Sequence, residues 1–241
     1  MKATKRYSHG LDFFVGFTWA KELATNGAND VFNRANQKGL GSNSIPLSLV
    51  TGFNYEIPKF SRNRLIRAVF SEWTIGGVRR YQSGSLIEVA GSNNQLNNAI
   101  FQGTRFNRVP GEPLFLKDLN CHCIDPYKDL VYNPKAWVDV PAGQWGSSAQ
   151  YYNDYRQARR PDEQFSLGRR FVIREGMSFQ IRGEFFNAFN RLQLANPTGA
   201  PNAATTYNAQ GQLTGGFGRI DPTATNGGLP RNGQIVARFQ W

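Results

Sequence analysis

The feature that most constrains the fold of this chain is the alternation of residues from Met177 to Asn190. Its odd-numbered residues up to Phe185 are apolar or glycine, and its even-numbered residues up to Glu184 are polar. Successive side chains of a strand point to opposite faces, so the stretch predicts one apolar face and one polar face. A helical period near 3.6 would mix Arg182 into the apolar set, which argues against an amphipathic helix. The run exceeds the roughly 5–6 residues of an ordinary strand, whereas a tilted strand that crosses a bilayer needs about 9–11 residues. It therefore predicts a transmembrane β-strand.

The last residues of the sequence repeat this pattern. One face would carry Ile235, Ala237, Phe239 and Trp241. Polar residues such as Arg238 occupy the alternate positions. A final strand that ends on a bulky aromatic residue is typical of the aromatic girdle at a membrane interface. The alternative is a C-terminal strand of a soluble sandwich.

Four further segments alternate in the same way. The six predicted strands are 11–21, 46–57, 73–82, 163–173, 177–190 and 233–241. Three residues break the pattern: Phe14 lies among polar positions, and Arg79 and Arg169 lie among apolar ones. An arginine near the bilayer midplane costs about 2–4 kcal/mol, so we expect Arg79 near the rim, where its side chain can snorkel. Residues 59–71 stay ambiguous between a short helix at 65–70 and the start of a strand.

The connections between these segments differ greatly in length. Long loops are expected at about 22–45, 90–162 and 191–233, and Arg174–Gly176 is a tight turn. Outer-membrane barrels have short periplasmic turns and long extracellular loops, so the three long loops are expected on the outside. Six strands do not close a barrel, because the smallest type has eight. The predicted fold class is all-β, a partial transmembrane antiparallel β-barrel with about six strands.

The order of several short motifs resembles the C-terminal region of TonB-dependent outer-membrane receptors of the Oar-like branch. The motifs are SHGLDFFVGFTWAKEL from Ser8, EWTIGGVRRYQSGS from Glu72, GEFFNAFNR from Gly183, FGRI from Phe217 and PRNGQIVARFQW at the end. Each motif alone is weakly specific, and their order carries the resemblance. It covers most of this chain but only the last third of such a receptor.

This resemblance implies a protein of a Gram-negative-type outer membrane that binds an unknown ligand at its outer loops and imports it with TonB. Its closing strand, with Ile235, Ala237, Phe239 and Trp241, resembles the signal that the barrel-assembly machinery reads. The first ten residues lack the apolar region of a signal peptide. We therefore expect the chain to be a fragment, or its true start to lie upstream. The resemblance implies that the plug domain and the segment that contacts TonB also lie upstream of Met1. Outer-membrane lipid is the other expected partner.

The charge of the chain raises a different possibility. The 241 residues carry a formal charge of +11, which invites a nucleic-acid interpretation. The basic residues are scattered, however, and no zinc-finger, helix-turn-helix or RNP-like pattern is present. No nucleic-acid partner is expected. Mean hydropathy is −0.49 and aromatic residues make up 13% of the chain. Both values fit a barrel, in which only alternate residues meet lipid.

Candidate catalytic and metal-binding groups are few. Cys121, His122 and Cys123 are consecutive. Two thiolates and an imidazole suit zinc, but adjacent residues rarely reach one ion and no second ligand pair follows at a suitable spacing. A disulfide is the plainer interpretation, and free thiols are a third. No GxSxG, HExxH or phosphate-loop motif occurs, so neither an enzyme nor a cofactor is expected.

The longest loop supplies the candidate ligand contacts, which rest on loop position alone: Trp137, Trp145, Tyr151, Tyr152 and Arg156. Two alternatives from other classes stay open. One is an outer-membrane barrel or adhesin that transports nothing. The other is a soluble β-sandwich that binds carbohydrate through its aromatic residues.

Overall fold

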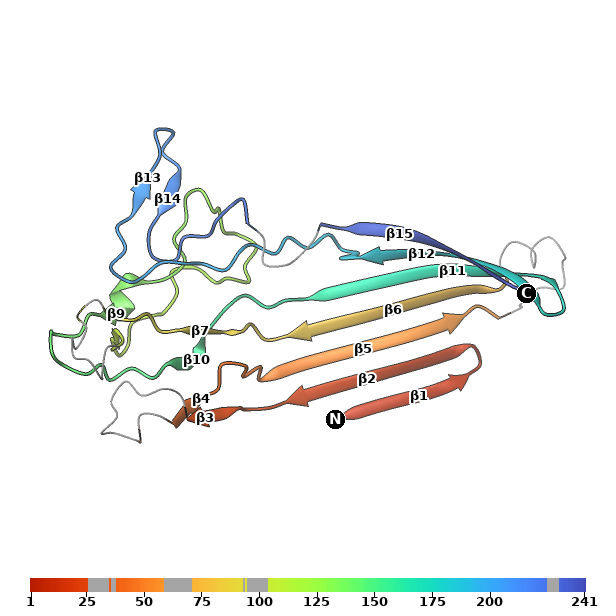
Figure 1. The fold of residues 1–241 in the computed structure, drawn as a ribbon, viewed down its shortest axis with the longest axis horizontal. Helices are drawn as coiled ribbons and strands as arrows, with labels where there is room; N and C mark the ends of the chain where they lie inside the picture. Colours follow the sequence, from red (N-terminus) through yellow and green to blue (C-terminus); the bar gives the residue numbers. More distant parts are fainter. Residues whose placement is uncertain (26–34, 36–37, 59–70, 93, 95–103, 225–229) are drawn as a thin grey trace.

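A single antiparallel sheet of seven strands dominates the computed structural model, which describes residues 1–25, 35, 38–58, 71–92, 94, 104–224 and 230–241. The strand order is β1-β2-β5-β6-β11-β12-β15, so each long strand lies beside its neighbour in sequence. Figure 1 shows the strands running side by side along the length of the molecule. Their bounds are β1 Lys2–Ser8, β2 Leu11–Trp19, β5 Leu47–Glu56, β6 Trp73–Gln82, β11 Asp162–Arg174, β12 Met177–Phe186 and β15 Asn232–Gln240.

The six predicted strands are confirmed, with differences at their ends. The predicted end of the strand at Asn190 was wrong. The strand stops at Phe186 because Asn187 and Asn190 adopt left-handed backbone conformations, with φ of 46° and 51°. Asparagine tolerates this conformation better than most residues. The seventh strand, β1, was not predicted. The ambiguous segment at 65–70 lies outside the described residues.

The register of the sheet places most apolar side chains on one face and most polar side chains on the other. Phe13 pairs with Phe53, Phe165 with Phe185, and Phe179 with Phe239, all on one face. This apolar face remains exposed: Ile235 is 78% exposed and Phe239 47% exposed. Because the apolar residues are not packed into an interior core, the sheet matches the predicted lipid-facing wall.

The three residues that break the alternation have local explanations. Phe14 pairs with Gly52 on the polar face, and its ring lies where a Cβ at Gly52 would be. The Arg79 guanidinium lies 5.2 Å from the centroid of the Phe165 ring. The Arg169 guanidinium lies 4.7 Å from the centroid of the Phe171 ring. A cation over an aromatic ring is stabilised by the ring quadrupole, which lowers the cost of an arginine on this face.

The long connections all leave the same end of the sheet (Figure 1). They contain four pairs of short strands: β3 Leu23–Thr25 with β4 Lys38–Leu40, β7 Leu86–Glu88 with β10 Tyr151–Arg156, β8 Asn107–Arg108 with β9 Trp137–Val138, and β13 Thr206–Tyr207 with β14 Leu213–Gly215. A 3₁₀ turn, Pro134–Ala136, precedes β9. Together these segments form what we call the loop layer. The tight turns at His9–Gly10 and Glu175–Gly176 lie at the opposite end of the sheet, as the sequence predicted for the second of them.

The sheet is open, with β1 and β15 as its edges. Among the residues with described structure, no helix is long and apolar enough to cross a membrane.

Substitutions at Leu167 and its neighbour Ser166 would show which face of the sheet meets lipid. Leu167 lies midway along β11 on the apolar face, whereas Ser166 lies on the polar face opposite Glu184. We expect Leu167→Arg to destabilise the membrane-inserted protein by about 2–4 kcal/mol. Ser166→Arg should change stability little, because the new charge stays in water near a carboxylate. Urea unfolding in detergent or lipid, followed by unheated gel electrophoresis, measures the difference. Equal loss for both variants would contradict the assignment of the faces.

Candidate ligand-binding surface

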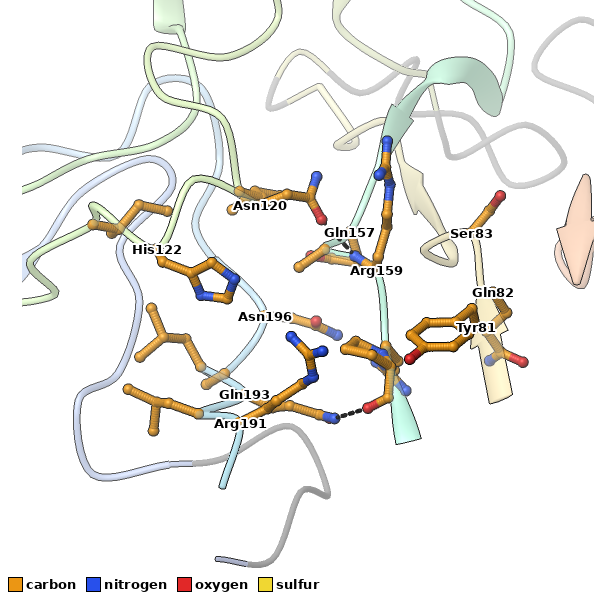
Figure 2. Close-up of a pocket in the computed structure, with 18 of the residues that line it drawn as sticks. Tyr81, Gln82, Ser83, Asn120, His122, Gln157, Arg159, Arg191, Gln193 and Asn196 are labelled. Carbon is orange, nitrogen blue, oxygen red and sulfur yellow. Dashed lines mark hydrogen bonds between the residues drawn. The ribbon is translucent and has the colours of Figure 1, made fainter. Parts of the chain in front are cut away.

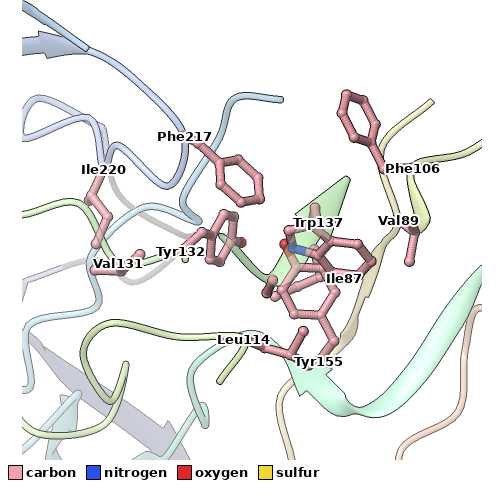
Figure 3. Close-up of a cluster of buried hydrophobic side chains, with 11 residues drawn as sticks. Ile87, Val89, Phe106, Leu114, Val131, Tyr132, Trp137, Tyr155, Phe217 and Ile220 are labelled. Carbon is pink, nitrogen blue, oxygen red and sulfur yellow. The ribbon is translucent and has the colours of Figure 1, made fainter. Parts of the chain in front are cut away.

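The buried core of the molecule lies in the loop layer rather than against the sheet. Tyr132 is its centre: its ring centroid lies 5.0 Å from that of Phe217 and 5.4 Å from that of Tyr155. Trp137 extends the cluster, 5.3 Å from Tyr155. Figure 3 shows these rings converging with Val89 and Leu114 from separate segments of the chain. Such offset aromatic contacts add to the stabilisation from buried area. The loop layer is therefore packed like a small domain.

Polar contacts fix the loop layer to the ends of the long strands. Arg156 is the main tie, because its guanidinium donates hydrogen bonds to the carbonyl oxygens of Ser44 (2.6 Å) and Gly84 (3.2 Å). These carbonyls belong to the connections before β5 and after β6. Within the layer, Arg108 donates two hydrogen bonds to Asp154, at 3.2 and 2.6 Å, and lies 4.8 Å from the Tyr152 ring centroid.

The GEFFNAFNR motif (183–191) makes a second set of polar contacts, which attach the segment after β12 to the start of β11. Glu163 is fully buried, and Arg191 donates to both of its carboxylate oxygens at 2.9 Å. The Tyr81 hydroxyl donates to the same carboxylate at 2.9 Å. The turn after β12 returns Ala188 to β11, where its amide donates to the Glu163 carbonyl oxygen at 3.0 Å. A buried carboxylate is tolerated only when it is paired and hydrogen-bonded in this way. The motif therefore closes the outer end of β12 onto β11.

A cavity of about 730 Å³, here called the tyrosine groove, lies beside the β3–β4 hairpin. Tyr151 and Tyr152 line it from the loop layer, and Trp19 lines it from the end of β2. Lys21 and Lys38 supply positive charge. Burial, and then the Glu88 carboxylate, raise the pKa of Tyr151, so its phenol stays neutral and can donate a hydrogen bond. Aromatic walls with a few polar groups are typical of a ligand site.

The structure separates the five candidate ligand contacts. It brings Tyr151 and Tyr152 together in the tyrosine groove. Trp137 is buried in the aromatic core, and Trp145 is half-buried in the segment before β10. Arg156 has its guanidinium occupied by backbone carbonyls and by Asn153. Sequence reasoning did not include Trp19 or Lys38, which lie far from the longest loop in sequence.

A second cavity of about 790 Å³, here called the rim cavity, lies where the apolar face meets the loop layer. Phe17, Leu49 and Tyr81 line it from the strands. Figure 2 shows Tyr81, Gln82 and Ser83 on its strand side, with His122 and Asn196 on its loop side. Gln193 and Pro161 also line it, and the Gln193 side chain donates to the Pro161 carbonyl oxygen at 3.1 Å.

The Cys121-His122-Cys123 segment lies at this second cavity as a disulfide loop. The two sulfurs are bonded and the Cα atoms are 5.1 Å apart, which confirms the disulfide interpretation over zinc or free thiols. His122 has φ of 53° and lines the rim cavity. Within the described ranges, no three histidine, cysteine or acidic side chains gather as a metal site.

The four residues of the expected assembly signal lie along the edge of the sheet. Ile235, Ala237 and Phe239 share the apolar face of β15, and Trp241 follows the strand, 88% exposed. The ring centroids of Phe239 and Trp241 are 5.9 Å apart. This exposed, unpaired edge leaves the residues accessible to another protein.

Comparison with known proteins gives one match. A family model described as "Outer membrane beta barrel domain" matches residues 1–234. No curated protein and no solved structure matches the chain.

Tyr155 tests whether the loop layer is a cooperative unit. Its buried ring contacts Tyr132, Trp137 and Phe115. Removing a buried aromatic side chain costs about 3–5 kcal/mol, so we expect Tyr155→Ala to unfold the layer while the long strands stay paired. Hydrogen exchange should show lost amide protection at 104–155 and unchanged protection in β11 and β12. Tyr207→Ala, at an exposed hairpin, is the control. Protection that survives at 104–155 would contradict the prediction.

Proposed function

The chain belongs to the outer membrane beta-barrel domain family, and we propose that it forms the C-terminal part of an Oar-like, TonB-dependent receptor. Its family places the protein in an outer membrane. The proposed receptor binds a ligand at the loop layer and imports it, and the membrane is of the Gram-negative type. Binding and passage involve no covalent chemistry.

The observation that carries this proposal is the packed loop layer at one end of the sheet. A barrel that only anchors or seals needs no buried aromatic core outside the membrane. Here Tyr132, Tyr155 and Trp137 pack the longest connection against the connection between β12 and β15, and the tyrosine groove lies beside this packed core. A rigid surface loses less conformational entropy when it binds than a flexible loop does. The order of the sequence motifs supports the receptor class.

The groups in the tyrosine groove suit binding better than catalysis. Burial also raises the pKa of Tyr132 and Tyr155 in the adjacent core, so both phenols remain protonated near neutral pH. Lys21 and Lys38 favour a ligand with negative or electron-rich oxygen groups, and the aromatic rings favour a flat or apolar part. After capture, a plug domain upstream of this chain would move under the action of TonB. The β15 edge, with its terminal aromatics, would be read by the barrel-assembly machinery.

Of the two alternatives, one remains. A non-transporting barrel or adhesin would use the same loop layer to hold a surface partner. The soluble carbohydrate-binding sandwich is wrong, since the described strands form one large sheet with an exposed apolar face and no second large sheet packed against it.

Uptake measurements separate transport from adhesion. Cells with and without the gene, and with and without TonB, are given a panel of labelled iron chelates, peptides and oligosaccharides. We expect uptake of one class to require both the gene and TonB. The double variant Tyr151→Ala/Lys38→Ala should reduce that uptake at least about tenfold, because it removes one ring and one charge from the groove.

The matched control is Tyr207→Ala/Lys135→Ala, which makes the same changes at exposed positions outside the groove. Both double variants should reach the outer membrane in wild-type amounts. If no uptake depends on the gene, or if the dependence does not require TonB, the adhesin alternative replaces the transporter.

A further inference from the structure

We propose that the rim cavity binds the head group of a phosphorylated, hydroxyl-bearing lipid of the outer leaflet. The acyl chains of this lipid would run along the apolar face of the sheet. The site is separate from the tyrosine groove, and it rests on the orientation of the sheet rather than on transport.

The position of the rim cavity shows which two surfaces a bound molecule would contact. Phe17, Leu49 and Tyr81 belong to the same apolar face that carries Phe53 and Phe165 toward the middle of the strands. They lie near the loop ends of β2, β5 and β6. A molecule in the rim cavity therefore touches the surface expected to meet lipid and the loop layer at once. Leu47 and Leu192, both lining residues, are 48% and 71% exposed and extend the apolar surface.

The charge of the cavity selects an anion. Arg159, Arg160 and Arg191 line it, and no aspartate or glutamate does. Arg191 is already neutralised by the buried Glu163. Arg159 and Arg160 make no ion pair with any described residue. Guanidinium groups bind phosphate oxygens through charge-assisted hydrogen bonds, which gain strength beside an apolar surface.

Two buried polar atoms of the cavity lining lack hydrogen-bond partners in the structure. They are the Nε of Arg160, a donor, and the Oε1 of Gln157, an acceptor. Nearly all buried polar atoms in proteins are hydrogen-bonded, so each of these exceptions points to a ligand or a water as its partner. A phosphate oxygen would accept from Arg160, and a head-group hydroxyl would donate to Gln157.

The same features disfavour other occupants. A choline head group would bring a fixed positive charge to Arg159 and Arg160, with no carboxylate in the lining to balance it. A free phosphate would use the arginines but would leave the apolar surface of Phe17, Leu47 and Leu49 in water. A lipid with both an anionic head and acyl chains satisfies both halves of the cavity.

The test titrates the purified protein, in a non-ionic detergent, with fluorescent phosphatidylglycerol and then with fluorescent phosphatidylcholine. We expect phosphatidylglycerol to bind at least about tenfold more tightly. Arg159→Gln/Arg160→Gln should abolish that preference, because it removes both unpaired charges. The control Arg174→Gln/Arg238→Gln removes the same charge from exposed positions outside the rim cavity and should keep the preference. Circular dichroism checks that both variants remain folded.

Each outcome decides for or against the proposal. Equal binding of the two lipids, or loss of the preference in both double variants, would overturn it. Full competition by inorganic phosphate at the concentration of the lipid would also overturn it, since the site would then take a soluble anion. A preference that disappears only in Arg159→Gln/Arg160→Gln supports it. Unchanged uptake in that variant would leave the transport proposal intact, so the two proposals fail separately.

Discussion

The structure depends on the need to pair every backbone amide and carbonyl that leaves water. In hydrocarbon an unpaired peptide group costs several kcal/mol, so a spanning strand must have a partner on both sides. The ladder from β1 to β15 provides this for the five inner strands, and its register shifts only between Lys5 and Ser8 and between Val172 and Arg174, each next to a tight turn. Because the ladder fixes the register, one face receives most of the apolar side chains and the other most of the polar ones.

The two outer strands pose a topological problem that the ladder does not solve. Seven strands that are each antiparallel to the next leave β1 and β15 running in the same direction. They cannot pair with each other in antiparallel fashion, so closure of this sheet on itself is excluded for an all-antiparallel barrel. A closed, all-antiparallel barrel that contained this sheet would need an odd number of further strands between them, which would give the even total of bacterial outer-membrane barrels.

The strands could be predicted because their pattern is local in the sequence. Most of the site could not, because its residues come from segments that are far apart in the sequence. A period of two is local, so six long strands could be identified from their own residues. β1 was missed because Lys5 takes an apolar position there, where its ammonium donates to the Ser8 carbonyl oxygen at 3.1 Å. The core of the loop layer has no period: Val89, Tyr132 and Phe217 meet only after the chain folds. Tyr151 and Tyr152 were identified from loop position, but Trp19 and Lys38 reach the groove from other connections.

The arginines show why net charge alone misleads about this chain. Arg170 and Arg238 flank Gln180 on the polar face, where water solvates them. Arg108 and Arg156 are held by a carboxylate and by backbone carbonyls in the loop layer. Arg79 and Arg169 lie over aromatic rings on the apolar face. A nucleic-acid surface would gather its cations on one element, whereas this fold distributes them over two faces and a rim. Among the described arginines, Arg159 and Arg160 meet an apolar surface without a carboxylate in the cavity lining, which is why we propose this pair as a binding feature.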